Sequence, residues 1–151
     1  KKELKNEEMT EDIIKTVVAM ANGKGGEIIL GIGDPQNKAH NDWTEVGLNI
    51  TDMSGSMTPD TYQNNINSKI KGTADSGLLQ RVKINAFFSG GDHFCIIEVK
   101  PIPESMINNE TFYTIKQQAY YRKKGITEPL EEISRKPHRE EMRKALYPEK
   151  N

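Results

Sequence analysis

The chain has 151 residues, of which 28% are charged, and its formal net charge is −1. This length predicts a single domain, and the near-zero net charge excludes nucleic-acid binding through overall positive charge, so that any such binding must use a local basic patch. The single cysteine, Cys95, excludes an intramolecular disulfide, and the lack of an apolar run of roughly 18 residues excludes a membrane-spanning helix.

The first elements that the sequence predicts are a short strand at residues 2–5 and an amphipathic helix that ends at Ala21. Thr10 is the expected N-cap, with acidic residues directly after it, where their charge suits the helix dipole. The apolar positions recur at helical spacing and form one face: Ile13, Val17, Met20 and Ala21.

A glycine-rich turn and an apolar strand follow this helix. Asn22 and the glycines at 23, 25 and 26 are expected to end the helix, because both residue types tolerate the left-handed conformation. The run at residues 28–32 predicts a strand covered on both faces, which ends at Asp34 before Pro35. A phosphate-binding loop is excluded, because its glycines would lie between a strand and a helix, whereas these follow a helix and precede a strand.

The rest of the chain carries further helical and strand patterns. Helices are predicted at residues 59–71, 128–135 and 137–146, and strands at residues 81–88, 93–100, 112–115 and 119–122. The strands at 81–88 and 93–100 are joined by a Ser-Gly-Gly-Asp hairpin turn. These elements predict an α+β fold with one mixed, mostly antiparallel sheet flanked by helices.

Two pairs of residues raise the question of metal chemistry. His93 and Cys95 lie at i and i+2 on one strand, but a metal site needs three or four ligands, so none is predicted there. Glu3 and Asp34 would converge if their strands pair, and paired acids bind Mg²⁺ or Mn²⁺ for phosphodiester hydrolysis. The alternative, which the residues alone favour, is that Glu3 is a surface charge and Asp34 a turn residue.

Basic side chains gather beside two adjacent tyrosines. Phosphate contacts by lysine and arginine, combined with base stacking on tyrosine, are typical of nucleic-acid binding. The alternative is a solvated surface whose charge is diluted by the glutamates between residues 131 and 141. The candidate nucleic-acid contacts are Tyr120, Tyr121, Arg122, Lys123 and Lys124, with Arg81 and Lys83 added if they lie on the same face.

Three motifs of the chain are found together in one known family. They are the strand Glu3-Leu4-Lys5, the helix end and strand that run from Ile13 to Asp34, and Tyr120-Tyr121-Arg122 followed by Gly125 and Thr127. Over about residues 3–130 the chain therefore resembles the Schlafen AlbA-type domain. It departs from the family pattern at Gly23-Lys24 and at Lys123-Lys124, which is one residue longer than usual before Gly125.

The resemblance implies a compact α+β domain that binds nucleic acid and forms one module of a larger protein. Some eukaryotic members use three acids as an RNA endonuclease site, and by match Glu3 would be the second acid and Asp34 the third. The first acid would precede Glu3, outside a chain that begins at Lys1. The family's arginine after its aromatic pair matches Arg122.

Three functions are open at this point. The leading hypothesis is a non-enzymatic module that binds DNA or RNA in a cytoplasmic regulator of transcription. The second is a Mg²⁺- or Mn²⁺-dependent RNA endonuclease, and the third is a protein-interaction or homodimerisation module. We expect the domain to occupy residues 1–135 and residues 136–151 to form a C-terminal helix or tail leading to further domains, with no membrane partner and no other cofactor.

Overall fold

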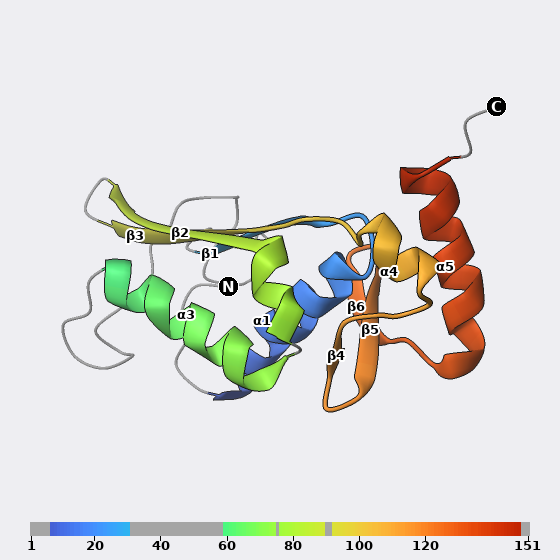
Figure 1. Cartoon of the computed structure of the whole chain (residues 1–151). Helices are drawn as coiled ribbons and strands as arrows, with labels where there is room; N and C mark the ends of the chain where they lie inside the picture. The colour runs from blue at the N-terminus through green and yellow to red at the C-terminus, as the bar shows by residue number, and fades with distance from the viewer. Residues whose placement is uncertain (1–6, 31–58, 75, 90–91, 149–151) are drawn as a thin grey trace.

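The computed structural model describes residues 7–30, 59–74, 76–89 and 92–148 (Figure 1). Within these residues the chain is α+β, as predicted, but the strands form two separate three-stranded antiparallel sheets where one mixed sheet was expected. The predicted strand at 2–5, together with Glu3 and Asp34, lies outside the described residues. No described helix is long and apolar enough to cross a membrane.

Helices and strands follow one another along the chain as these elements. They are α1 (Glu7–Ala21), β1 (Gly26–Leu30), α3 (Pro59–Thr73), the 3₁₀ helix η1 (Ser76–Arg81), β2 (Val82–Ser89), β3 (Asp92–Val99), α4 (Glu104–Asn108), β4 (Thr114–Ile115), β5 (Gln118–Lys123), β6 (Ile126–Pro129) and α5 (Glu132–Leu146). The predicted helix at 59–71 and strands near 82–88, 93–100 and 119–122 are therefore confirmed.

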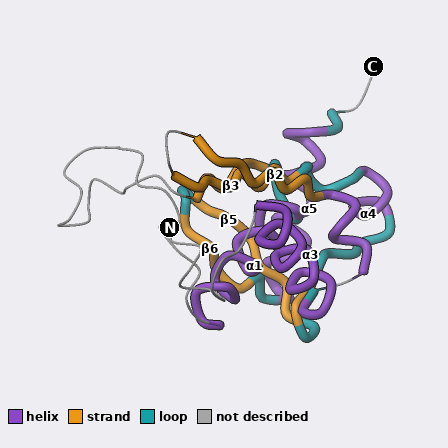
Figure 2. Tube along the Cα trace, turned by 90° about the vertical axis from the view of Figure 1, so that its left-hand side faces the viewer, coloured by secondary structure: helices purple, strands orange, loops and turns teal. Residues whose placement is uncertain are grey.

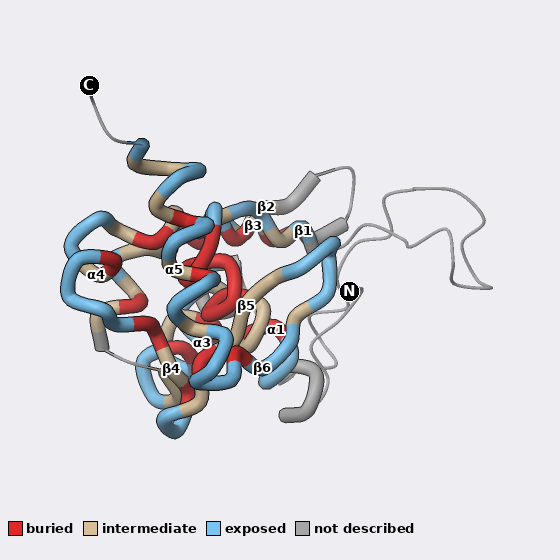
Figure 3. Tube along the Cα trace, turned by 90° about the vertical axis from the view of Figure 1, so that its right-hand side faces the viewer, coloured by how far each residue is buried: buried red, intermediate tan, exposed pale blue. Residues whose placement is uncertain are grey.

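The α1 helix lies at the centre of the molecule, between the two sheets (Figures 1 and 3). It begins at Glu7, so the prediction that Thr10 caps it was wrong. Glutamates suit the first turn of a helix, which allows it to start earlier. Burial also extends beyond the single apolar face, because both Ile14 and Val18 are buried. A helix covered from several sides needs apolar residues around most of its circumference.

The first sheet has the strand order β1-β3-β2 and is covered by α1 and α3 on one face (Figure 2). The expectation that the β1 run is covered on both faces was wrong, because Ile29 is 46% exposed. Ile28 and its partner Ile97 pack toward the core, whereas Ile29 and Ile96 lie on the other face of the pleat. An edge strand with helices on one side buries only alternate residues.

The turn between α1 and β1 depends on glycine, as predicted. Gly25 donates its N–H to the carbonyl of Met20 at 2.9 Å and has φ +74°, so it ends the helix in the left-handed conformation. A Cβ at Gly25 would also clash with the carbonyl oxygen of Val99. The glycine cluster is therefore a helix end that delivers β1 against β3.

The second sheet has the order β4-β5-β6 and is built from two tight hairpins. Lys116 and Gln117 join β4 to β5, and Lys124 and Gly125 join β5 to β6, all four with positive φ. Two-residue turns with positive φ at both positions match the twist of antiparallel strands. The pairing of β6 with β5 was missed, because Ile126–Pro129 had been assigned partly to a helix.

The α5 helix is continuous where two helices were predicted, and Pro137 lies inside it. His138 and Met142, four residues apart, are both buried and lie on the face that packs on Phe112 and Leu130. Pro137 removes one backbone hydrogen bond near the start of the helix. The burial of this face offsets that loss.

Cys95 provides a test of the core between α1 and the first sheet. Its thiol is fully buried, and burial raises its pKa from 9.0 to about 12. Because the native state retains the proton that the unfolded state loses, stability should fall between pH 9 and pH 12, by about 1.4 kcal/mol per pH unit from this group. Urea unfolding at neutral pH and near pH 10 should show a smaller alkaline loss in Cys95→Ala. An equal loss of stability in both proteins would indicate that the thiol is in contact with water and has an ordinary pKa.

Candidate nucleic-acid interface

A groove runs between α1 and β5 and is lined by polar side chains from both elements. It consists of two hollows, of about 530 and 290 Å³, which share Lys15 and Tyr120. The larger one is lined by Asp12, Lys15 and Thr16 from α1 and by Tyr120, Arg122 and Thr127 from the β5–β6 hairpin. The smaller one continues past Gln118 to the β4–β5 turn at Lys116.

The strand period explains why these residues meet. Alternate side chains of a strand point to opposite faces of its sheet. On β5, Tyr120 and Arg122 therefore face α1, while Ala119 and Tyr121 face α5, where they pack on the cluster that contains Met142. The adjacent tyrosines of the sequence thus lie on opposite faces of the sheet.

Lys15 and Tyr120 form the middle of the groove. The Lys15 ammonium nitrogen lies 5.7 Å from the centre of the Tyr120 ring, within the range of a cation–π contact. Tyr120 is half-buried, and its ring also packs against the core beneath α1. This contact holds an aromatic ring and an ammonium group side by side at the surface.

Arg122 is held by hydroxyl groups. Its Nη1 donates to Thr127 Oγ1 at 2.8 Å, and Thr127 Oγ1 lies 3.2 Å from Thr16 Oγ1 on α1. Among the residues that the structure describes, neither Lys15 nor Arg122 forms an ion pair. Both cations therefore retain their charge for a ligand in the groove.

The remaining predicted contacts lie in three other places. Lys124 is exposed in the β5–β6 turn, beside Gly125 at one end of the groove, and Lys123 is exposed at the end of β5, on the face that carries Tyr121. Tyr121 lies on the opposite face of the sheet, where its hydroxyl donates to Glu128 at 3.1 Å; this hydrogen bond is the main reason that the pKa of Tyr121 is raised. Arg81 and Lys83 belong to η1 and the first sheet.

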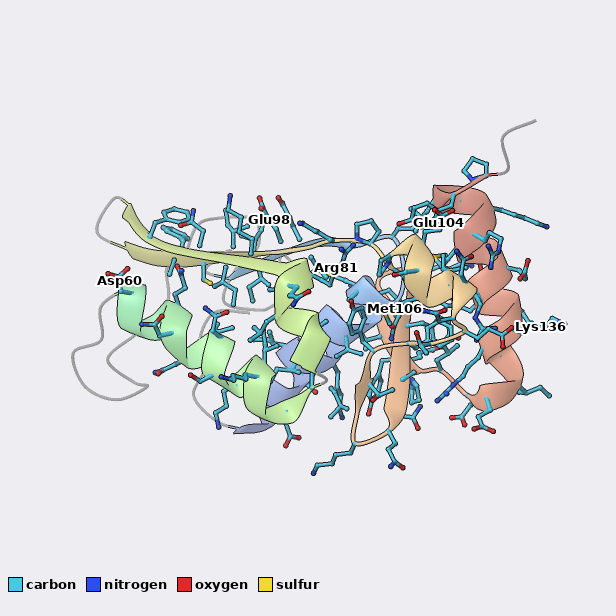
Figure 4. All side chains as sticks on the ribbon, viewed as in Figure 1. Asp60, Arg81, Glu98, Glu104, Met106 and Lys136 are labelled. Carbon is cyan, nitrogen blue, oxygen red and sulfur yellow. The ribbon has the colours of Figure 1, made fainter. Side chains whose placement is uncertain are left out.

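Arg81 and Lys83 do not join the groove. The Arg81 guanidinium donates to the carbonyl of Pro101, and the residue lies where η1 meets β2 (Figure 4). Lys83 is paired in register with Glu98, which points away from the helices in the same view. The structure thus separates these two cations from Arg122, although the sequence allowed them to share one face.

The basic residues Arg139 and Arg143 of α5 also lie outside the groove. Arg139 lies over the Phe112 ring at 5.3 Å and is 4.0 Å from the carboxylate of Glu110. Arg143 donates to the Asn108 side chain at 3.0 Å. These two arginines tie α5 to the segment around α4.

Sequence reasoning missed the contribution of α1 to this site. Asp12, Lys15 and Thr16 recur at i, i+3 and i+4, so they form the polar stripe of the helix beside its apolar face. That stripe is visible in the sequence, but it would ordinarily indicate a solvated surface. Only the packing of β5 and β6 alongside α1 makes it one wall of a groove.

The described residues include no group of three or more histidine, cysteine, aspartate and glutamate side chains that could hold a metal ion. Cys95 is buried, as expected for a core residue. Because Glu3 and Asp34 lie outside the described residues, their assignment as catalytic acids stays a prediction.

The family model described as "Schlafen, AlbA_2" matches residues 1–131. The chain belongs to the Schlafen AlbA_2 family. No curated protein matches this AlbA_2 domain at a significant level.

Two solved structures share the fold of the AlbA_2 domain. The DIP2311 protein from Corynebacterium diphtheriae has a TM-score of 0.57 and 18% sequence identity, over 93% of this chain and 20% of its own. The N-terminal domain of an ATP-dependent DNA helicase RecG-related protein from Nitrosomonas europaea has a TM-score of 0.51 and 20% identity, over 78% of this chain and 73% of its own. The chain thus spans only a fifth of the length of the first.

Asn22, the residue that follows α1, holds β5 in place and thereby positions one wall of the groove. This fully buried side chain donates to the carbonyls of Tyr113 at 2.9 Å and Tyr120 at 3.0 Å, and accepts from the Tyr113 N–H at 2.7 Å. The backbone carbonyl oxygen of Asn22 lies 2.8 Å from His138 Nε2. Because a carbonyl oxygen can only accept, His138 is the donor of that bond.

Replacement of Asn22 tests this arrangement. Asn22→Ala should lower the free energy of unfolding by about 3 kcal/mol or more, because it removes three hydrogen bonds to the backbone, two of them buried. The matched control is Asn64→Ala, an exposed position on α3, where we expect a change within about 0.5 kcal/mol. Urea denaturation measures both. A loss at Asn22 no larger than that at Asn64 would contradict the role of the amide.

Proposed function

We propose that this AlbA_2 domain is a non-enzymatic module that binds DNA or RNA in the groove between α1 and β5. The observation that carries the proposal is the pair of cations, Lys15 and Arg122, which border one groove beside the ring of Tyr120 and have no ion-pair partner among the described residues. Phosphate oxygens are the ligands that such cations bind, and an aromatic ring beside them suits a base or a sugar.

The exposed turns extend this positive charge along the groove. Lys116 borders the smaller hollow at one end, and Lys124 lies in the β5–β6 turn at the other, whereas Lys123 lies on the face of β5 that carries Tyr121. Five residues of β5, from Gln118 to Arg122, span roughly 13 Å over four steps of about 3.3 Å, which suits a segment of a few nucleotides. A ligand that follows the strand would therefore meet Lys116 at one end and Lys15 and Arg122 in the middle, with the carboxylates of Glu11 and Asp12 on the α1 side of the groove.

Family membership and the structural neighbour support the same class of ligand. The Nitrosomonas europaea structure is the N-terminal domain of a protein described as ATP-dependent DNA helicase RecG-related. We extend that association to this chain, as a module of a longer regulatory protein in the cytoplasm.

A binding panel with single- and double-stranded DNA and RNA, at two salt concentrations, tests the proposal. We expect Arg122→Ala to weaken binding by about tenfold or more, because a charge-assisted phosphate contact is worth about 1.5–3 kcal/mol. Lys15→Ala should weaken binding in the same way. The slope of log affinity against log salt should become less negative by about 0.7 to 0.9 in each variant, one phosphate contact being lost.

Lys136→Ala is the matched control, since Lys136 is an exposed cation on α5 that points away from the rest of the domain (Figure 4). It should leave affinity unchanged. Lys83→Ala tests separately whether the first sheet adds contacts, as the sequence suggested. Failure of the wild-type chain to bind any probe would exclude the proposal, and cleavage of RNA that depends on Mg²⁺ or Mn²⁺ would favour the endonuclease hypothesis instead.

A further inference from the structure

The hydroxyl groups of Thr16 and Thr127 connect α1 to Arg122 through a chain of hydrogen bonds in which all donors point the same way. Thr16 Oγ1 donates its only proton to the carbonyl of Asp12, one turn earlier in α1, at 2.9 Å. In the 3.2 Å contact between the two hydroxyls, the donor must therefore be Thr127. Thr127 Oγ1 accepts in turn from Arg122 Nη1. The order of donors is thus Arg122, Thr127, Thr16 and the helix backbone.

This chain of bonds uses one donor of Arg122 and leaves the others for a ligand. A guanidinium group has five N–H donors, and only one of them is bonded to a described residue. An arginine side chain loses rotamer entropy when it is fixed on binding. If the side chain is already held in the free protein, less of that cost arises when the ligand binds.

We propose that Thr127, supported by Thr16, is a positioning residue that holds the Arg122 guanidinium in the orientation in which it contacts phosphate. The inference rests on the proposed function of the groove and adds to it a specific role for two residues that do not carry charge. Thr127 lies directly across from Arg122 in the β5–β6 register, so the hydroxyl reaches the guanidinium without any displacement of the backbone.

A purely structural role for these hydroxyls is the competing explanation. The contact between Thr16 and Thr127 also joins β6 to α1, and its loss could loosen the hairpin regardless of Arg122. The two explanations differ in one respect. A positioning residue affects binding only while Arg122 is present, whereas a structural link affects it in either case.

A double-mutant cycle separates them. Thr127→Val removes the hydroxyl but keeps the branched shape, and Thr127→Ser keeps the hydroxyl. With fluorescein-labelled oligonucleotides, we expect Thr127→Val to weaken binding about fivefold, Thr127→Ser to restore it, and Thr127→Val to have no effect in the Arg122→Ala background. Equal losses in the two backgrounds, or wild-type affinity in Thr127→Val, would overturn the inference while leaving the proposed function intact.

A second measurement needs no nucleic acid. In ¹⁵N NMR spectra, the hydrogen-bonded Nη1 of Arg122 should rotate slowly enough to give its own N–H signals in the wild-type domain and in Thr127→Ser. In Thr127→Val these signals should average with those of a freely rotating guanidinium. Free rotation in the wild-type domain would overturn the inference. Failure of every probe to bind would exclude the proposed function and with it the role of Thr127 in phosphate binding, whereas loss of the slow rotation alone would exclude only the role of Thr127.

Discussion

The hydrogen bonds of Asn22 are the constraint on which the rest of the structure depends. Its side chain is bonded to the backbone on both sides of the β4–β5 hairpin, at Tyr113 and Tyr120, and its carbonyl is bonded to His138 of α5. One residue at the end of α1 thus joins the central helix, the second sheet and the C-terminal helix. In a buried setting these polar groups have no alternative partner in water, so the three elements are bound to one relative arrangement.

That arrangement includes a helix beyond the part of the chain that the family model matches. The match ends at residue 131, whereas α5 runs from Glu132 to Leu146 and contributes His138 and Met142 to the interior. The boundary expected after residue 135 falls inside this helix. The α5 helix thus packs on the side of the second sheet that faces away from α1 and the groove.

Local pattern was sufficient to predict the elements whose own residues determine them. The glycines after α1, the alternation in β2 and the helix that opens at Pro59 were all visible, because turn chemistry and periodicity act within a few residues. Ile126–Pro129 carries no such alternation and is a strand only because β5 pairs with it. The five-residue α4 and the passage of α5 through Pro137 likewise depend on tertiary packing.

In the candidate site, too, some residues can be recognised from local sequence and others only from tertiary packing. Arg122 and Tyr120 could be identified from the sequence because a cation follows aromatic residues. Lys15 and Thr16 belong to the polar stripe of α1, which becomes a wall of the groove only because the second sheet packs beside it. The sequence also placed Tyr121 with Tyr120, although strand geometry puts neighbours on opposite faces. A correct strand assignment therefore already contained the information that separates the two tyrosines.

The charges of the chain illustrate why composition alone says little about binding. Arginines at 122, 139 and 143 contribute equally to a net charge of −1. Arg139 and Arg143 are engaged with Phe112, Glu110 and Asn108, where they stabilise the contact between α5 and α4. Arg122 is bonded only to a neutral hydroxyl among the described residues, so its charge is not compensated. Affinity for phosphate depends on such uncompensated cations and on how firmly they are held, and a nearly neutral protein can therefore offer cations for phosphate in a groove that Asp12 and Glu11 also line.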